Sequence, residues 1–210
     1  ITRAEENIQR MMAFQQRQPR VRVVHHPLDA PNGQIQEAVA AEYADDEIGA
    51  WEYDATARVL IAEIPRGQSR WNQANFDAET FQTYFESVPG VAGQMALILR
   101  DVKWDGSLGE IHHRPPVSVS SHNYRVELSV QRGTTYPAEG RVLGVFVKLS
   151  TRTFIYILVF PTNVEHFALQ NVLEANRQRT DRLVRYQTSV QELKELAPTL
   201  PILQYLSQAE

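Results

Sequence analysis

The stretch Phe154-Ile155-Tyr156-Ile157-Leu158-Val159-Phe160 is the longest uninterrupted apolar run in this chain of 210 residues. Seven residues are too few for a helix that crosses a membrane, and we find no longer candidate for a span. A short apolar run rich in β-branched and aromatic residues, followed by a proline, is typical of a strand buried on both faces. We therefore expect this segment to be a central strand of a sheet.

The residues before this run alternate apolar and polar side chains, which is typical of strands with one face in water. Asp105-Gly106 has the composition of a tight hairpin turn. Pro115-Pro116 requires an extended step that lacks backbone donors. These patterns predict an antiparallel β-meander over about residues 95–160. The expected strands cover residues 95–104, 117–120, 124–131, 142–149 and 154–160.

Helices are expected at both ends of the chain. Thr2 and Glu5 form a capping box, which predicts a helical arm over residues 1–20 that ends at Pro19. Thr162 and Glu165 form a second capping box, and apolar heptad positions then predict a long closing helix over residues 163–197. A helix of about 35 residues would extend roughly 50 Å. It either breaks near Arg179 or leaves the core to contact a partner.

Shorter elements complete the prediction. Residues 51–64 have the pattern of a hairpin with a polar turn near residues 54–56. Asp77 is expected to open a helix whose apolar side chains recur at helical spacing from Phe81. No repeat or break in composition divides the chain. The sequence thus predicts a single α+β domain over residues 1–210, in which the meander packs against the helices.

The composition excludes several classes of protein. With 43% hydrophobic residues the chain is not intrinsically disordered. It contains no cysteine, which excludes disulfides, a thiolate nucleophile and cysteine-based zinc sites. This absence weakly favours an intracellular location, although a cysteine-free secreted protein would have the same composition. The motifs GxSxG, HExxH and GxxxxGK[ST] are absent. The sequence therefore predicts neither a cofactor nor a metal site.

Two aromatic residues stand out in a polar segment. Trp71 and Phe76 lie among arginine and amide side chains, between Arg66 and Asp77. Large aromatic side chains beside arginine are typical of the residues that dominate binding at protein interfaces. An aromatic residue in a loop equally often fills the core. Both alternatives are open for this pair.

The histidines provide the best concentration of titratable groups. His112 and His113 precede the two prolines, and His122 follows ten residues after His112. Adjacent residues of a strand point to opposite faces, so only one of the first two can act together with His122. Such a pair would belong to an enzyme or to a small-ligand pocket. The other interpretation is that the histidines are scattered over the surface.

A third candidate site is basic. Arg177, Arg179, Arg182 and Arg185 cluster in the predicted closing helix, and the last three have helical spacing. Such a patch would contact nucleic-acid phosphates. The net charge of −4 argues against nucleic acid, and the arginines can instead pair with neighbouring acids on the helix surface.

Charge along the chain is segregated. The first 22 residues are rich in arginine, whereas residues 23–57 contain acids but neither lysine nor arginine. Asymmetry of this kind is typical of a segment that contacts another surface. Our leading hypothesis is a non-enzymatic protein-interaction or assembly module, which contacts a protein partner or further copies of itself through the N-terminal arm, the Trp71 segment and the closing helix.

Overall fold

The computed structural model describes residues 51–53, 57–66, 71–87, 96–119, 123–131, 133–179 and 182–208. Contacts between Cα atoms divide the chain into two units, Ile1–Ile48 and Gly49–Glu210. The first unit, and with it the predicted helical arm, lies outside the described residues. The described residues all belong to the second unit.

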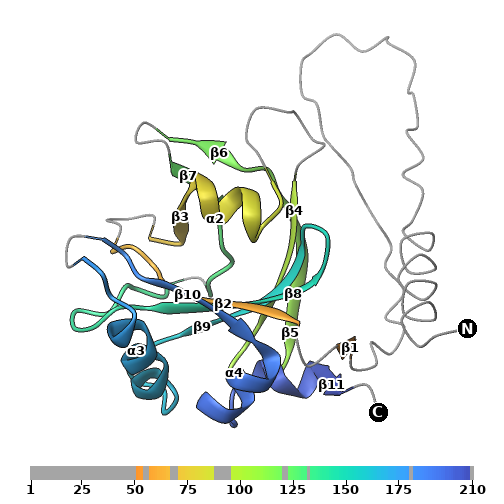
Figure 1. Ribbon diagram of the computed structural model, residues 1–210, viewed down its shortest axis with the longest axis vertical. Coiled ribbons are helices and arrows are strands. Elements are labelled where there is room, and N and C mark those ends of the chain that lie inside the picture. Colours follow the sequence, from red (N-terminus) through yellow and green to blue (C-terminus); the bar gives the residue numbers. More distant parts are fainter. Residues whose placement is uncertain are drawn as a thin grey trace, which may run out of the picture. The chain divides into compact units, whose positions relative to one another are not determined.

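A six-stranded mixed sheet forms the centre of this unit (Figure 1). Its strands lie in the order β10-β2-β8-β9-β4-β5, and every neighbouring pair is antiparallel except β9 and β4, which are parallel. The strands are β2 Arg58–Glu63, β4 Leu97–Val102, β5 Leu108–Arg114, β8 Leu143–Ser150, β9 Thr153–Val159 and β10 Arg185–Ser189.

The prediction of a central strand at residues 154–160 is confirmed, because β9 has neighbours on both sides and both of its faces are buried. Ile155, Ile157 and Val159 belong to one hydrophobic cluster. Phe154 and Tyr156, whose side chains alternate with these, belong to the other. The sheet thus separates two cores, and each of its faces needs a covering layer.

Different elements cover the two faces. A three-stranded sheet in the order β3-β7-β6 and helix α2 contribute to the aromatic-rich cluster on one face. Helices α3 and α4 and the 3₁₀ segment η1 contribute to the aliphatic cluster on the other. Strands β1 and β11 form a separate parallel pair. These elements are β1 Trp51–Tyr53, β3 Gln73–Asp77, α2 Ala78–Thr83, β6 Val117–Ser118, β7 Asn123–Glu127, α3 His166–Ala175, α4 Val190–Leu196, η1 Pro201–Tyr205 and β11 Leu206–Gln208.

The predicted fold class, an α+β domain with an antiparallel meander and a long closing helix, is wrong. The described part of the unit is mostly β-sheet, with a few short helices. Strands β6 and β7 leave the main sheet to form the second sheet, so β4 pairs with β9 in parallel instead of through a chain of hairpins. Local alternation identifies a strand but not its neighbour, because pairing depends on contacts between distant segments.

The long helix over residues 163–197 is also wrong. Helix α3 ends at Ala175, and the segment that follows enters the main sheet as β10, which pairs with β2. The Arg177 guanidinium contacts the buried carboxylate of Glu63 on β2, with 2.6 Å between Nη2 and Oε1. The chain leaves the helical path next to this contact, which ties the residues after α3 to the main sheet.

Some of the predictions that rested on a few consecutive residues are confirmed, and others are wrong. Asp77 caps α2 as predicted, because its Oδ1 accepts a hydrogen bond from the Thr80 N–H at 2.8 Å. A hairpin at Asp105-Gly106 is present between β4 and β5, with Gly106 at a φ of 85°. The expected two-residue turn is wrong, because the connection covers residues 103–107 and Asp105 does not have a positive φ. The hairpin predicted over residues 51–64 is wrong, since β1 pairs with β11. In the described part of the chain, no helix has the length and apolar character that crossing a membrane requires.

Candidate functional site

One continuous segment, residues 108–118, supplies an edge strand to each sheet. Strand β5 is the last strand of the main sheet, and β6 is the last strand of the small one. Pro115-Pro116 lies between them, and proline cannot donate to a ladder of backbone hydrogen bonds. The prolines therefore end one ladder and allow the chain to cross to the other sheet.

A cavity of about 300 Å³ lies at this crossing. Its walls come from the crossing segment and from the ends of β3 and β7. We call it the crossing pocket. Its lining residues are Gln73, Arg114, Pro115, Val117, Arg125 and Glu127.

The strand register explains why polar side chains meet here. Gln73 lies opposite Glu127, and Val117 lies opposite Arg125. Residues opposite each other in a sheet project from the same face. The alternate residues of these strands, such as Val126, are buried against the main sheet. The outward face of the small sheet therefore carries the polar set.

Positive charge exceeds negative charge in the crossing pocket. The Arg114 Nη1 atom lies 3.8 Å from the Glu127 Oε2 atom, a separation at the outer limit of an ion pair. The buried Nε atom of Arg114 has no hydrogen-bond partner among the described residues. The Nη1 group of Arg125 donates to the neutral Oε1 of Gln73 at 2.6 Å. Two guanidinium groups thus face one carboxylate, which partly compensates only one of them.

Two titratable groups lie near β5 but outside the pocket lining. Burial raises the pKa of Asp101, whose carboxylate lies over Gly109 of β5. Burial also raises the pKa of Tyr156 to about 12, and its hydroxyl oxygen accepts a hydrogen bond from the Ser129 N–H at 2.6 Å. The tyrosine is therefore protonated at neutral pH.

The predicted histidine site stays a prediction, because only part of it lies among the described residues. His112 lies opposite the core residue Leu99, and His113 lies opposite Ile98, so the two imidazoles occupy opposite faces of β5 as expected. His122 lies outside the described residues, so its pairing with either histidine stays a prediction. Within the described ranges, no three histidine or acidic side chains are grouped so that they could hold a metal ion.

The two aromatic candidates lie in the core. Trp71 and Phe76 are both buried. The Trp71 indole N–H donates to the Thr134 carbonyl at 3.3 Å, and its ring packs edge-on against Tyr136. Of the two alternatives for this pair, the structure supports the core role.

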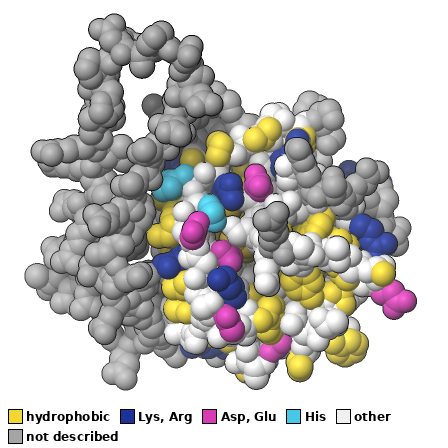
Figure 2. All heavy atoms as spheres, turned by 180° about the vertical axis from the view of Figure 1, so that it is seen from behind, with side chains coloured by type: hydrophobic (Ala, Val, Ile, Leu, Met, Phe, Trp, Pro, Cys, Tyr) yellow, Lys and Arg dark blue, Asp and Glu magenta, His cyan; other side chains and the backbone are white. Residues whose placement is uncertain are grey.

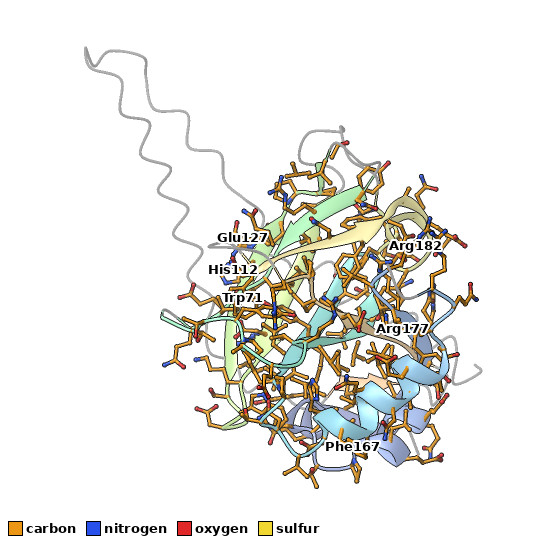
Figure 3. The ribbon with its side chains drawn as sticks, turned by 90° about the vertical axis from the view of Figure 1, so that its left-hand side faces the viewer. Trp71, His112, Glu127, Phe167, Arg177 and Arg182 are labelled. Carbon is orange, nitrogen blue, oxygen red and sulfur yellow. The ribbon has the colours of Figure 1, made fainter. Side chains whose placement is uncertain are left out.

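The arginine patch has no helix beneath it. Arg185 lies in β10 and pairs with Asp77 at 2.7 Å, while Arg177 is held by Glu63 and Glu174. Arg179 and Arg182 are exposed and lie between α3 and β10. Figure 3 shows Arg177 and Arg182 far from His112 and Glu127, so these two arginines lie in a different region from the crossing pocket.

Arg114, Arg125 and Glu127 are not among the site residues predicted from the sequence. Two features of the sequence could have indicated these residues. The predicted strand 124–131 has a polar face, and Pro115 restricts the backbone conformation of Arg114. Neither feature shows that β7 and the end of β5 meet, because this meeting depends on the crossing between sheets.

Comparisons with known proteins add little. No family model matches the chain, and no curated protein matches it. Among solved structures, the N-terminal domain of Helicobacter pylori LlaJI.R1 is similar at 7% sequence identity and a TM-score of 0.44. The match covers 62% of this chain and 97% of that chain. Similarity at this level carries no argument about function.

Proposed function

We propose that this protein is a non-enzymatic protein-interaction module, and that it binds an acidic side chain of a partner protein in the crossing pocket. The observation that supports this proposal is the excess of guanidinium over carboxylate in the pocket, including a buried Arg114 Nε without a partner among the described residues. A buried donor that lacks an acceptor is costly, so a ligand that supplies an acceptor is favoured.

A carboxylate fits the chemistry of this pocket. Guanidinium groups bind carboxylates through paired, charge-assisted hydrogen bonds, which are stronger than bonds between neutral groups. Pro115 and Val117 add an apolar wall, and the Val117 side chain is 50% exposed. An acidic residue with an apolar neighbour would contact both parts of the site.

The residues that line the pocket are suited to binding and not to acid–base catalysis. Its ionisable groups are two arginines, which are poor proton carriers at neutral pH, and one glutamate. The two described histidines of β5 diverge to opposite faces, so they do not form an acid–base pair with each other.

Fluorescence polarisation with a library of labelled ten-residue peptides tests the proposal. The peptides would carry a central Glu, Asp, Gln or Asn in varied apolar surroundings. We expect the acidic peptides to bind more tightly than their amide counterparts. Replacing Arg125 by Gln should weaken the best acidic peptide by roughly tenfold or more, because a charge-assisted bond contributes about 1.5–3 kcal/mol.

The matched control is Lys103→Gln, which removes one positive charge from an exposed position outside the pocket lining. Equal loss of affinity in both variants would indicate a general charge effect and would refute the pocket. Equal affinity for acidic and amide peptides would also refute it. Binding of a labelled single-stranded oligonucleotide that Arg125→Gln abolishes, without any acidic-peptide binding, would replace the protein partner by a nucleic acid.

A further inference from the structure

Strand β5 has one side unpaired in the described part of the chain. It is an edge strand of the main sheet, and Glu110, Ile111 and His113 are exposed along it. Ile111 lies near the middle of the strand with 40% of its surface exposed. An edge strand presents unpaired backbone groups that can pair with another strand.

We infer that a second copy of this chain pairs with β5, antiparallel and in the register that places Ile111 opposite Ile111. In a two-fold symmetric pairing, the same strand serves on both sides and one residue faces itself. With the axis at Ile111, Glu110 lies opposite His112 of the partner copy, and this pair occurs twice. Gly109 then lies opposite His113, and Leu108 lies opposite Arg114.

Charge along β5 is what identifies a second copy as the occupant. The glutamate and the histidine flank Ile111 symmetrically, so two-fold pairing places each carboxylate opposite an imidazole, which can donate a hydrogen bond to it. In a parallel, in-register pairing each glutamate would face a glutamate, which is repulsive. Figure 2 shows histidine, acidic and basic side chains close together on the face seen from behind.

Another antiparallel register is possible in principle, with the axis at His112 and Glu110 opposite Arg114. The structure disfavours it in two ways. The Arg114 guanidinium already faces Glu127 of its own chain, and its side chain is only 26% exposed. In that register the exposed Ile111 would face His113 instead of a second isoleucine. The axis at Ile111 therefore places two exposed isoleucine side chains opposite each other and does not require a second acidic partner for Arg114.

This inference concerns the edge of β5 and goes beyond the proposed function. Glu110 and Ile111 do not line the crossing pocket. Arg114 belongs both to the paired strand and to the pocket lining, so the strand pairing is tested with substitutions at Glu110, Ile111 and His112, which leave every pocket residue in place. Dimerisation and peptide binding are measured separately, so either can fail while the other holds.

Because the chain has no cysteine, single cysteines report the register directly. Opposite residues in an antiparallel pair are within the range of Cα separations that a disulfide spans. Under mild oxidation of the full chain, Ile111→Cys should give a covalent dimer that a reducing agent reverses, whereas Glu139→Cys, at an exposed position between β7 and β8, should not. A covalent dimer from His112→Cys but not from Ile111→Cys would place the axis at His112 and overturn the inferred register.

Sedimentation equilibrium of the full chain tests the charge argument. We expect Glu110→Arg and His112→Glu each to weaken dimerisation by roughly tenfold, since each reverses two symmetric pairs. The double variant should recover most of the loss because it restores opposite charges. A wild-type chain that stays monomeric at every accessible concentration, or a double variant as weak as the singles, would overturn the inference.

Discussion

The ion pair between Glu63 and Arg177 offers the sharpest test of how this fold is held together. Glu63 is only 4% exposed, at the end of β2. Its Oε1 accepts from the Arg177 Nη2 at 2.6 Å, and its Oε2 accepts from the Val184 N–H at 2.8 Å. Arg141 approaches less closely, at 3.6 Å. One carboxylate thus anchors both ends of the segment that links α3 to β10.

Removing either charge should lower the free energy of unfolding substantially. Breaking a buried ion pair by deleting one partner costs about 3–5 kcal/mol. Glu63→Gln keeps an oxygen that accepts from the Val184 N–H, and Arg177 keeps its contact with Glu174. We therefore expect this variant to lose about 3 kcal/mol of its free energy of unfolding. Arg177→Met leaves the carboxylate with the more distant Arg141, and we again expect about 3 kcal/mol.

The double variant tests whether the two side chains act as a pair. The double variant leaves neither charge without its partner, so its free energy of unfolding should fall by only about 3–4 kcal/mol. This loss is well below the sum of the two single losses and implies a coupling energy of about 2–3 kcal/mol between the side chains. Urea unfolding followed by circular dichroism measures the three values. Costs that add to within about 0.5 kcal/mol would refute the anchoring role of this pair. Hydrogen exchange should show faster opening of the β10 amides in both single variants.

Two carboxylates should respond to pH in opposite ways. Burial raises the pKa of Asp101, so the contribution of this side chain to stability is lost as the pH rises through the raised pKa. Asp101→Asn should therefore unfold at a higher temperature than the wild type at pH 7. This difference in unfolding temperature should vanish near pH 3. A variant less stable than the wild type at pH 7 would contradict this. Burial alone would raise the pKa of Asp77, but the Thr80 N–H and the Arg185 guanidinium outweigh it and lower that pKa, so its contribution is present at pH 7 and lost in acid. Asp77→Ala should cost about 1–2 kcal/mol at pH 7 and progressively less in acid, measured by thermal unfolding; a cost independent of pH would exclude the ionic part.

Predictions from the sequence succeeded where the signal was local. The Asp77 cap and the existence of a hairpin at Asp105-Gly106 depend on a few consecutive residues, and both were predicted correctly. The prediction of the closing helix was wrong because its heptad positions are apolar at each end but hold Asn176 and Arg179 in the middle. Between these two, Arg177 contacts a distant partner on β2. The parallel pairing of β4 with β9 could not be predicted either, because it also depends on a contact between distant segments.

The candidate site shows the same division. His112 and His113 were correctly expected on opposite faces, because the alternation of a strand is a local property. The meeting of Arg114 with Glu127 was not expected, because these residues belong to strands of different sheets. Its cause is the crossing at Pro115-Pro116, whose direction the two residues alone do not specify.

By itself, the sequence determined that residues 154–160 form a strand buried on both faces, since seven consecutive apolar side chains can be removed from water only between two layers. It also determined which residues of β7 point outward, because polar and apolar residues alternate there. Only the tertiary structure decided which strands are neighbours, where α3 ends, and that two arginines share a pocket with one glutamate. These features depend on contacts between segments far apart along the chain, and such contacts leave no local pattern.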